Sequence, residues 1–244
     1  MPVAIMGENF NPERRTIKNN TIFLVTDPNG NIISNTSGYG LYTDDTRFLS
    51  RLELKINELD PILLSSSTEA GHSSVIISTN PILTDYFDQT KHILQETIQV
   101  KKESIIYGSF FETITISNYN FFNIGLKLEL FFEADFLDIF EVRNIFANKK
   151  NNLETIVHEN NILKFSYQDS TGATLSTEII FIEEKPIKIE NGQVIFEFLL
   201  GPTSVREIKY QIKLKSTASL PEKSTAYDFN EAFEKAIKDE KKMV

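Results

Sequence analysis

The sequence predicts an all-β protein, in the form of a large two-sheet antiparallel β-sandwich with a short C-terminal helix. Apolar and polar residues alternate with a period of two along most of the 244 residues, as in strands that bury one face and expose the other. Residues that favour turns separate these segments at short intervals. Roughly a dozen strands follow from this pattern, and so many strands favour one large sandwich over a small immunoglobulin-like domain.

Composition limits the kinds of partner that the chain can have. Hydrophobic residues make up 41% of the chain, which is enough to build a core. The net charge of −9 argues against nucleic acid and against anionic lipid, because both call for a basic surface. A neutral partner is compatible with this charge. The chain has no cysteine, which excludes disulfides and thiolate metal sites.

The first half of the chain carries clear strand and turn signals. An apolar run at 22–25 precedes the segment 27–31, where proline fixes φ and an Asn-Gly pair accepts a positive φ, so we expect a turn there. The alternation over 51–56 predicts a strand, and so does the alternation over 94–100. The segment 65–74 is polar and rich in turn formers, and we expect it to be a loop.

The same signals continue in the second half. Turns are expected at 118–120, at 169–172 and at the Asn-Gly pair 191–192. The strands that they separate are expected at 110–117, 124–132, 163–167, 175–182, 187–189, 194–199 and 208–214.

We expect the sandwich to occupy residues 1–215 as one domain. Residues 216–244 are expected to form a linker and the start of a helix. Within that segment, apolar residues follow helical spacing over 225–242, and Asp228 with Glu231 three residues later forms a plausible capping box.

Two dense charged blocks, at 40–52 and 133–143, contain the candidate functional residues. The candidates among their charged residues are Asp44, Asp45, Arg47, Asp135, Asp138, Glu141 and Arg143. Glycoside hydrolysis needs two carboxylates, so a cluster of acids could be catalytic. The alternative is that the acids order a corner after the 124–132 strand. We favour the structural interpretation, assign no catalytic residue, and expect these seven residues at a domain interface or a cleft rim.

We further predict that the two blocks lie close together at one end or edge of the sandwich. Each block carries an arginine and acids, and each adjoins a strand with an apolar face. Unpaired buried charge is unfavourable, and pairing across the blocks would remove this penalty. The planar guanidinium of Arg47 suits a carboxylate, and Asp45, Asp135 and Asp138 are its possible partners.

Other kinds of site find little support in the sequence. The three histidines are scattered without metal-binding spacing, and there is no nucleotide-binding or serine-hydrolase motif, so we expect no metal and no cofactor. Tryptophan, the largest platform for a sugar ring, is absent. Tyrosines could replace it, and the candidates are Tyr39, Tyr42, Tyr119 and Tyr167.

The two charged blocks, together with 24–27, Gly30, 107–112 and Asn118, resemble the N-terminal domain of the bacterial and archaeal glycogen-debranching (amylo-α-1,6-glucosidase-like) family. The resemblance runs from about residue 23 to about residue 214. It implies a mutarotase-like supersandwich. It also implies a following (α/α)-barrel, absent from this sequence, whose carboxylates hydrolyse the α-1,6 bond of an α-glucan.

This resemblance leads us to expect a non-catalytic domain that supports and borders the catalytic barrel of a glycoside hydrolase, with the chain alone inactive. The alternative is a stand-alone carbohydrate-binding or scaffolding sandwich. The sequence shows neither a signal peptide nor a membrane-spanning segment, so we expect a cytoplasmic protein.

Overall fold

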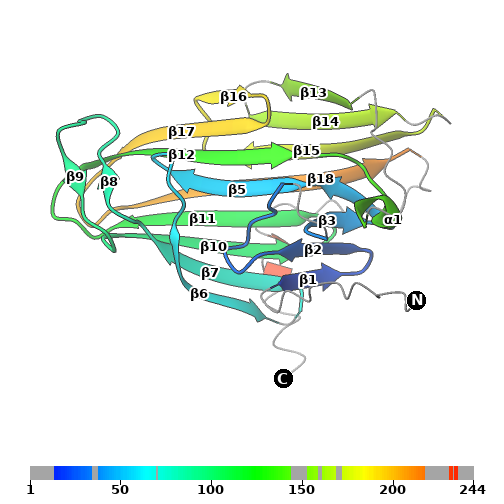
Figure 1. The fold of residues 1–244 in the computed structure, drawn as a ribbon, viewed down its shortest axis with the longest axis horizontal. Coiled ribbons are helices and arrows are strands. Elements are labelled where there is room, and N and C mark those ends of the chain that lie inside the picture. Colours follow the sequence, from blue (N-terminus) through cyan, green and yellow to red (C-terminus); the bar gives the residue numbers. More distant parts are fainter. Residues whose placement is uncertain are drawn as a thin grey trace, which may run out of the picture.

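The computed structural model describes residues 14–34, 38–69, 71–143, 153–158, 161–168 and 172–217, together with 231, 232, 234 and 235. These residues form antiparallel sheets and one short helix, which confirms the predicted all-β sandwich. Figure 1 shows the strands running roughly along the long axis of the molecule.

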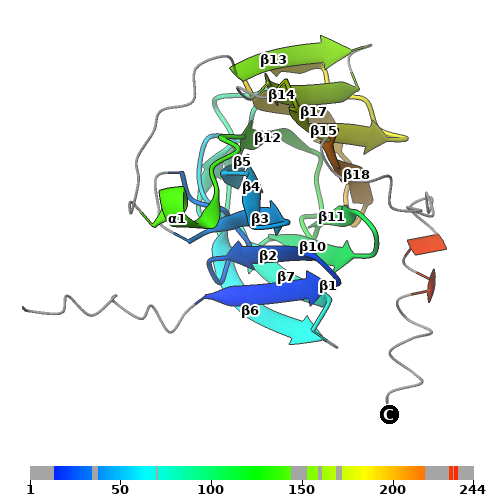
Figure 2. The same cartoon turned by 90° about the vertical axis from the view of Figure 1, so that its right-hand side faces the viewer.

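One layer of the sandwich is a single eight-stranded sheet. Its strands, in spatial order, are β13 (Leu153–His158), β14 (Ile162–Gln168), β15 (Thr174–Ile182), β18 (Val205–Ser216), β11 (Phe110–Asn118), β10 (Ile98–Ile106), β7 (Ser73–Thr79) and β6 (Ile62–Glu69). Figure 2 shows this sheet curving around the strands of the other layer.

The other layer contains two four-stranded sheets. The first has the order β16 (Lys188–Glu190), β17 (Gln193–Leu200), β12 (Ile124–Glu133) and β5 (Arg51–Ile56). The second has the order β1 (Arg15–Asn19), β2 (Ile22–Thr26), β3 (Gly40–Thr43) and β4 (Thr46–Leu49). An isolated bridge between Ile32 and Leu52 joins the β2–β3 connection to β5. A small hairpin of β8 (Leu83–Thr84) and β9 (His92–Ile93) lies at one end (Figure 1).

The core lies between the layers and is rich in aromatic side chains. Phe132 of β12 meets Phe181 of β15 and Tyr210 of β18, with ring centroids 6.3 and 5.7 Å apart. Phe196 of β17 packs edge-on against Phe181 at 5.5 Å. Edge-to-face packing suits the ring quadrupoles and adds to the gain from apolar burial. The alternation seen in the sequence therefore places one face of these strands in a shared core.

Two of the predicted elements are wrong. Residues 65–74 are not a loop, because β6 and β7 pair through this segment and turn at Gly71, which has a φ of 74°. β6 is the edge strand of its sheet, so its serines can face solvent while its backbone pairs with β7. The strand predicted at 94–100 begins only at Ile98, because Glu96 has a φ of 62° in a turn and Leu94 is exposed.

The C-terminal helix predicted at 225–242 falls mostly outside the described residues. Glu231, Ala232, Glu234 and Lys235 are described and are helical. Ala232 is fully buried and packs against Ile105 and Phe111 of the eight-stranded sheet. The division into residues 1–215 and 216–244 stays a prediction. In the part of the chain that the structure describes, no helix is long and apolar enough to cross a membrane.

Candidate functional site

The first charged block forms the β3–β4 hairpin. Asp44 and Asp45 are its two turn residues, with φ of 46° and 58°. Positive φ at both central positions gives the twist that a two-residue antiparallel turn needs, and aspartate tolerates it. Both side chains are exposed. Arg47 follows on β4 and is buried, with 9% of its surface exposed.

The second block forms a corner where the chain leaves β12. The short helix α1 (Ile139–Val142) ends this corner, and Asp138 is its N-cap. The Asp138 side chain accepts hydrogen bonds from the backbone N–H groups of Phe140 and Glu141, while the Glu141 side chain accepts one from the Asp138 backbone N–H. This reciprocal capping box satisfies N–H groups that the first turn of a helix leaves unpaired.

Phe136 anchors the same corner in the core. It is fully buried although its φ is 52°, a conformation that bulky residues rarely adopt. Its ring packs edge-on against Phe48 of β4, with centroids 5.6 Å apart, and stacks on Tyr167 of β14. These contacts hold the corner against both layers of the sandwich.

Backbone hydrogen bonds join the two blocks. The Arg47 N–H donates to the Leu137 carbonyl at 2.8 Å, and the Ile139 N–H donates to the Asp45 carbonyl at 2.9 Å. The corner therefore continues the β3–β4 hairpin as a short ladder, with a bridge between Thr46 and Asp138.

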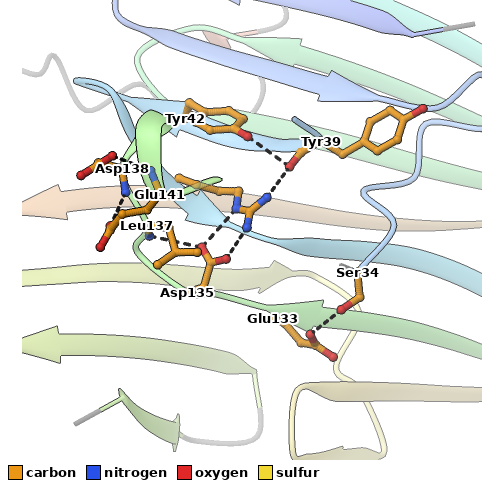
Figure 3. A network of polar contacts seen from close by, with 9 residues as sticks. Ser34, Tyr39, Tyr42, Glu133, Asp135, Leu137, Asp138 and Glu141 are labelled. Carbon is orange, nitrogen blue, oxygen red and sulfur yellow. Dashed lines mark hydrogen bonds and ion pairs between the residues drawn. The ribbon is translucent and has the colours of Figure 1, made fainter. Parts of the chain in front are cut away.

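Arg47 locks this junction through its guanidinium (Figure 3). Its Nε and Nη2 donate to the two carboxylate oxygens of Asp135 at 3.1 and 2.5 Å, and its Nη1 donates to the Tyr39 carbonyl at 3.1 Å. The Tyr42 hydroxyl donates to the same carbonyl at 3.2 Å. Burial lowers the pKa of Arg47, but the hydrogen bond and the charge of Asp135 outweigh it and leave the pKa raised. The predicted proximity of the two blocks is confirmed.

A second arginine lies beside this junction. Arg51 of β5 pairs with Glu133 at 2.9 Å and with Glu53 at 3.0 Å, and it lies over the Phe131 ring. The Ser34 hydroxyl donates to the other oxygen of Glu133 (Figure 3). Arg143 is exposed and follows α1, and no ion pair joins it to another described residue. Of the two arginines among the predicted site residues, Arg47 forms the junction and Arg143 takes no part in it.

The four tyrosines proposed as sugar platforms have different environments. Tyr39 and Tyr42 are buried, and Tyr42 stacks on Phe23. Tyr167 stacks on Phe136. Of these four tyrosines only Tyr119 is exposed, with 57% of its residue surface in solvent.

Sequence reasoning missed a pocket on a different part of the molecule. It lies between β5, the β2–β3 connection and the strands β7 and β10, and Lys102 is part of its wall. A signal for it exists in the sequence, because Lys102 occupies an inward position in the alternation of Ile98, Val100 and Ser104. No group of three metal-ligating side chains occurs among the described residues.

Comparisons with solved structures give distant similarities. A protein named as a candidate kojibiose phosphorylase from the human microbiome is 12% identical with a TM-score of 0.47, and the match covers 87% of this chain and 28% of that protein. The Slr1438 protein from Synechocystis sp. PCC 6803 is 8% identical with a TM-score of 0.47, and the match covers 83% of this chain and 95% of that protein. A protein named as a candidate aldose 1-epimerase from Escherichia coli is 7% identical with a TM-score of 0.45, and the match covers 83% of this chain and 98% of that protein.

Sequence comparisons give a family. The comparison with curated proteins gives no match. A family model described as the N-terminal domain of (some) glycogen debranching enzymes matches residues 17–211. This match begins within β1 and ends within β18, and it includes both charged blocks. The chain therefore belongs to the family of N-terminal domains of glycogen debranching enzymes.

Proposed function

We propose that this chain is a non-catalytic N-terminal domain of a glycogen-debranching-like glycoside hydrolase of the amylo-α-1,6-glucosidase type. Its role is to support and border an (α/α)-barrel that acts on α-glucan. Membership of the family supports the connection with a debranching enzyme. The acidic net charge is consistent with a neutral substrate and with a protein partner.

The observation that carries the proposal is the set of hydrogen bonds made by the acidic side chains of the corner. Asp135 is held at both oxygens by Arg47, Asp138 caps α1, and Glu141 completes the capping box. A glycosidase needs one carboxyl group to protonate the leaving oxygen and another to act as base or nucleophile. The acids of this corner instead hold the backbone, which supports a role in shape rather than in bond cleavage.

The outer face of the corner supports contact with a partner domain. Asp44, Asp45 and Asp138 are exposed there, and Phe140 leaves 57% of its surface in solvent. Aromatic residues are enriched at protein interfaces, which fits a contact between Phe140 and a partner domain. On this proposal, the partner barrel covers Phe140 and the acids border its cleft.

An activity assay of the 244-residue chain tests the proposal. We expect no glucose release from a branched dextrin, while a full-length debranching enzyme carrying this domain releases glucose under the same conditions. Turnover by the chain alone that disappears in Asp135→Asn or Asp138→Asn would overturn the proposal.

The alternative function, a stand-alone carbohydrate-binding or scaffolding sandwich, has one observation in its favour. Tyr119, Phe121 and Phe122 are 57%, 91% and 46% exposed on the connection between β11 and β12. Asn118 fixes this connection by donating to the carbonyls of Phe122 and Gly201. A module that binds glucan through these rings would bind long maltodextrin by itself and lose that binding in Phe121→Ala.

A further inference from the structure

A pocket of about 290 Å³ opens between the two layers, and none of its lining residues belongs to the two charged blocks. Leu54 and Val100, on β5 and β10, are buried in its wall. The β2–β3 connection and Pro61 contribute to the rim. Small-molecule sites in proteins occupy roughly 300 Å³ and more, so this pocket has the size for a single small ring.

Lys102 gives the pocket a buried charge. Only 5% of this residue is exposed. Its ammonium donates to the Gly30 carbonyl at 3.1 Å and to the Asn31 side-chain oxygen at 3.5 Å. A lysine ammonium has three N–H groups, so one donor remains after these two bonds. An oxygen atom of a bound molecule could accept from it.

The electrostatics of Lys102 agree with this interpretation. Burial lowers its pKa, and the charges of Glu112 and Asp27 act in the opposite direction, although no ion pair joins Lys102 to a carboxylate among the described residues. Burying a cation without a paired carboxylate is unfavourable. A ligand that brings an additional acceptor to the ammonium would reduce this penalty.

The turn that faces Lys102 is fixed before any ligand arrives. The Asn31 N–H donates to the Asp27 carboxylate at 2.7 Å, and the Gly30 N–H donates to the Asp27 carbonyl at 3.0 Å. Gly30 has a φ of 72°, and a Cβ there would come within 2.4 Å of a methyl carbon of Ile76. The turn therefore packs directly on the eight-stranded sheet, and its polar groups are preorganised.

The charges that line the pocket nearly balance. The acids are Asp27, Glu53 and Asp60, and the cations are Lys55 and Lys102. Lys55 pairs with Asp60 at 3.4 Å, and Glu53 pairs with Arg51 at 3.0 Å. Acids in the wall disfavour an anionic ligand, because like charges repel. The wall thus offers donors, acceptors and apolar surface to a ligand without net charge.

We propose that this pocket binds one neutral hexopyranose unit, such as a terminal unit of an α-glucan. A sugar hydroxyl accepts from Lys102, other hydroxyls donate to the pocket carboxylates, and the C–H groups of the ring contact Leu54 and Val100. The identity of the sugar rests on the proposed function. The existence of a site for a neutral polyhydroxylated ring rests on the pocket itself.

An NMR titration of the 244-residue chain with maltose tests this inference. We expect the amide signals of Gly30 and Asn31 to shift in a saturable manner. Lys102→Met should weaken binding at least about tenfold, because a hydrogen bond from a charged donor is lost. Asn31→Ala should also weaken binding, because it removes a polar side chain that lines the pocket, and it leaves the backbone hydrogen bonds of the turn intact. If Lys102→Met fails to fold, Asn31→Ala decides the test.

Matched controls separate this pocket from other surfaces. Lys91→Met makes the same change at a lysine whose side chain is 61% exposed outside the pocket, and binding should persist. Phe121→Ala should also leave pocket binding unchanged. The inference is overturned if maltose shifts no pocket signal, if binding survives both pocket variants, or if inorganic phosphate or glucose 6-phosphate binds there more tightly than maltose. None of these results bears on the dextrin assay, so the proposed function can stand while this inference fails.

Discussion

At the scale of single residues, Arg47 is the group on which the junction of the two charged blocks depends. Its side chain is 11% exposed and that of Asp135 is 27% exposed. Arg47→Ala would remove the guanidinium donors from this carboxylate and from the Tyr39 carbonyl. Asp135 would keep the Leu137 N–H as a donor, and the Tyr39 carbonyl would keep the Tyr42 hydroxyl. We expect the free energy of unfolding to fall by about 3 kcal/mol, because removing one partner of a buried pair leaves an uncompensated charge. Urea unfolding monitored by circular dichroism measures this loss.

Arg51→Ala is the matched control for that substitution. Its side chain is 26% exposed, and its partners Glu133 and Glu53 are 46% and 19% exposed. Water therefore replaces the contact with Glu133 more easily than the contact between Arg47 and Asp135. We expect a loss of about 1 kcal/mol or less. Equal losses of unfolding free energy for the two variants would show that burial of the Arg47–Asp135 pair adds nothing to its stabilising effect.

The sequence could predict that Arg47 pairs across the blocks, but not with which acid. Asp45 was a possible partner and lies instead in a turn with positive φ, where its side chain is exposed. Asp138 was another and is engaged as the N-cap of α1. The three acids have similar chemistry and similar sequence surroundings, so the partner of Arg47 is identified only by where each carboxylate lies in the folded structure.

At the scale of elements, the capping box determines the form of the corner. Asp138→Ala removes the acceptor for two backbone N–H groups of α1. We expect a loss of about 1 kcal/mol in unfolding free energy, the usual effect of removing an N-cap. Asp138→Asn should retain most of the stability, because asparagine caps about as well as aspartate. Thermal unfolding of the two variants side by side tests whether capping or charge matters here.

A charge ladder across three strands predicts a dependence of stability on pH. Glu178 of β15 pairs with Lys215 of β18 at 2.6 Å and with Lys164 of β14 at 3.3 Å. Burial raises the pKa of Glu178, but the hydrogen bonds and charges of the two lysines outweigh it and leave the pKa below its usual value of 4.5. The unfolded chain therefore takes up this proton first as the pH falls. The stabilisation is complete above the unfolded pKa and is lost as the pH falls through the folded one.

Glu178→Gln tests this dependence. At neutral pH we expect the variant to be less stable by about 1 kcal/mol or less, because the pair is partly exposed. Below pH 4.5 the difference should shrink and then vanish. A difference that stays constant down to the acid-unfolding range would show that the pair does not act through ionisation.

Periodicity predicted most strands because a half-buried strand requires alternation, as the burial of Leu52, Leu54 and Ile56 illustrates. It failed where a strand has no need of an apolar face. The serines of β6 lie at a sheet edge, where the strand is held mainly by backbone pairing with β7. It also failed at Glu96, where apolar neighbours continued the pattern through a turn that the Asn80 side chain stabilises.

At the scale of the whole molecule, the sandwich offers two different ends. Figure 1 shows α1 and β3 at one end and the β8–β9 hairpin at the other. Exposed aromatic residues occur at both, with Phe140 on α1 and Phe121 on the β11–β12 connection. A hydrogen bond from the Tyr119 N–H to the Thr97 carbonyl ties that connection to the chain that follows β9. A partner domain could therefore bind at either end, and the proposed function commits to the corner.

Paired serine substitutions distinguish the two ends. In a full-length debranching enzyme carrying this domain, Phe140→Ser should weaken docking of the barrel and lower the activity on branched dextrin, because a buried aromatic contact typically carries an interface. Phe140 is exposed in this chain, so the stability of the isolated domain should change by no more than about 0.5 kcal/mol. Phe121→Ser removes an even more exposed ring at the opposite end and should leave activity unchanged. If Phe121→Ser lowers activity and Phe140→Ser does not, the barrel docks at the end that carries Phe121, and the corner is not its contact surface.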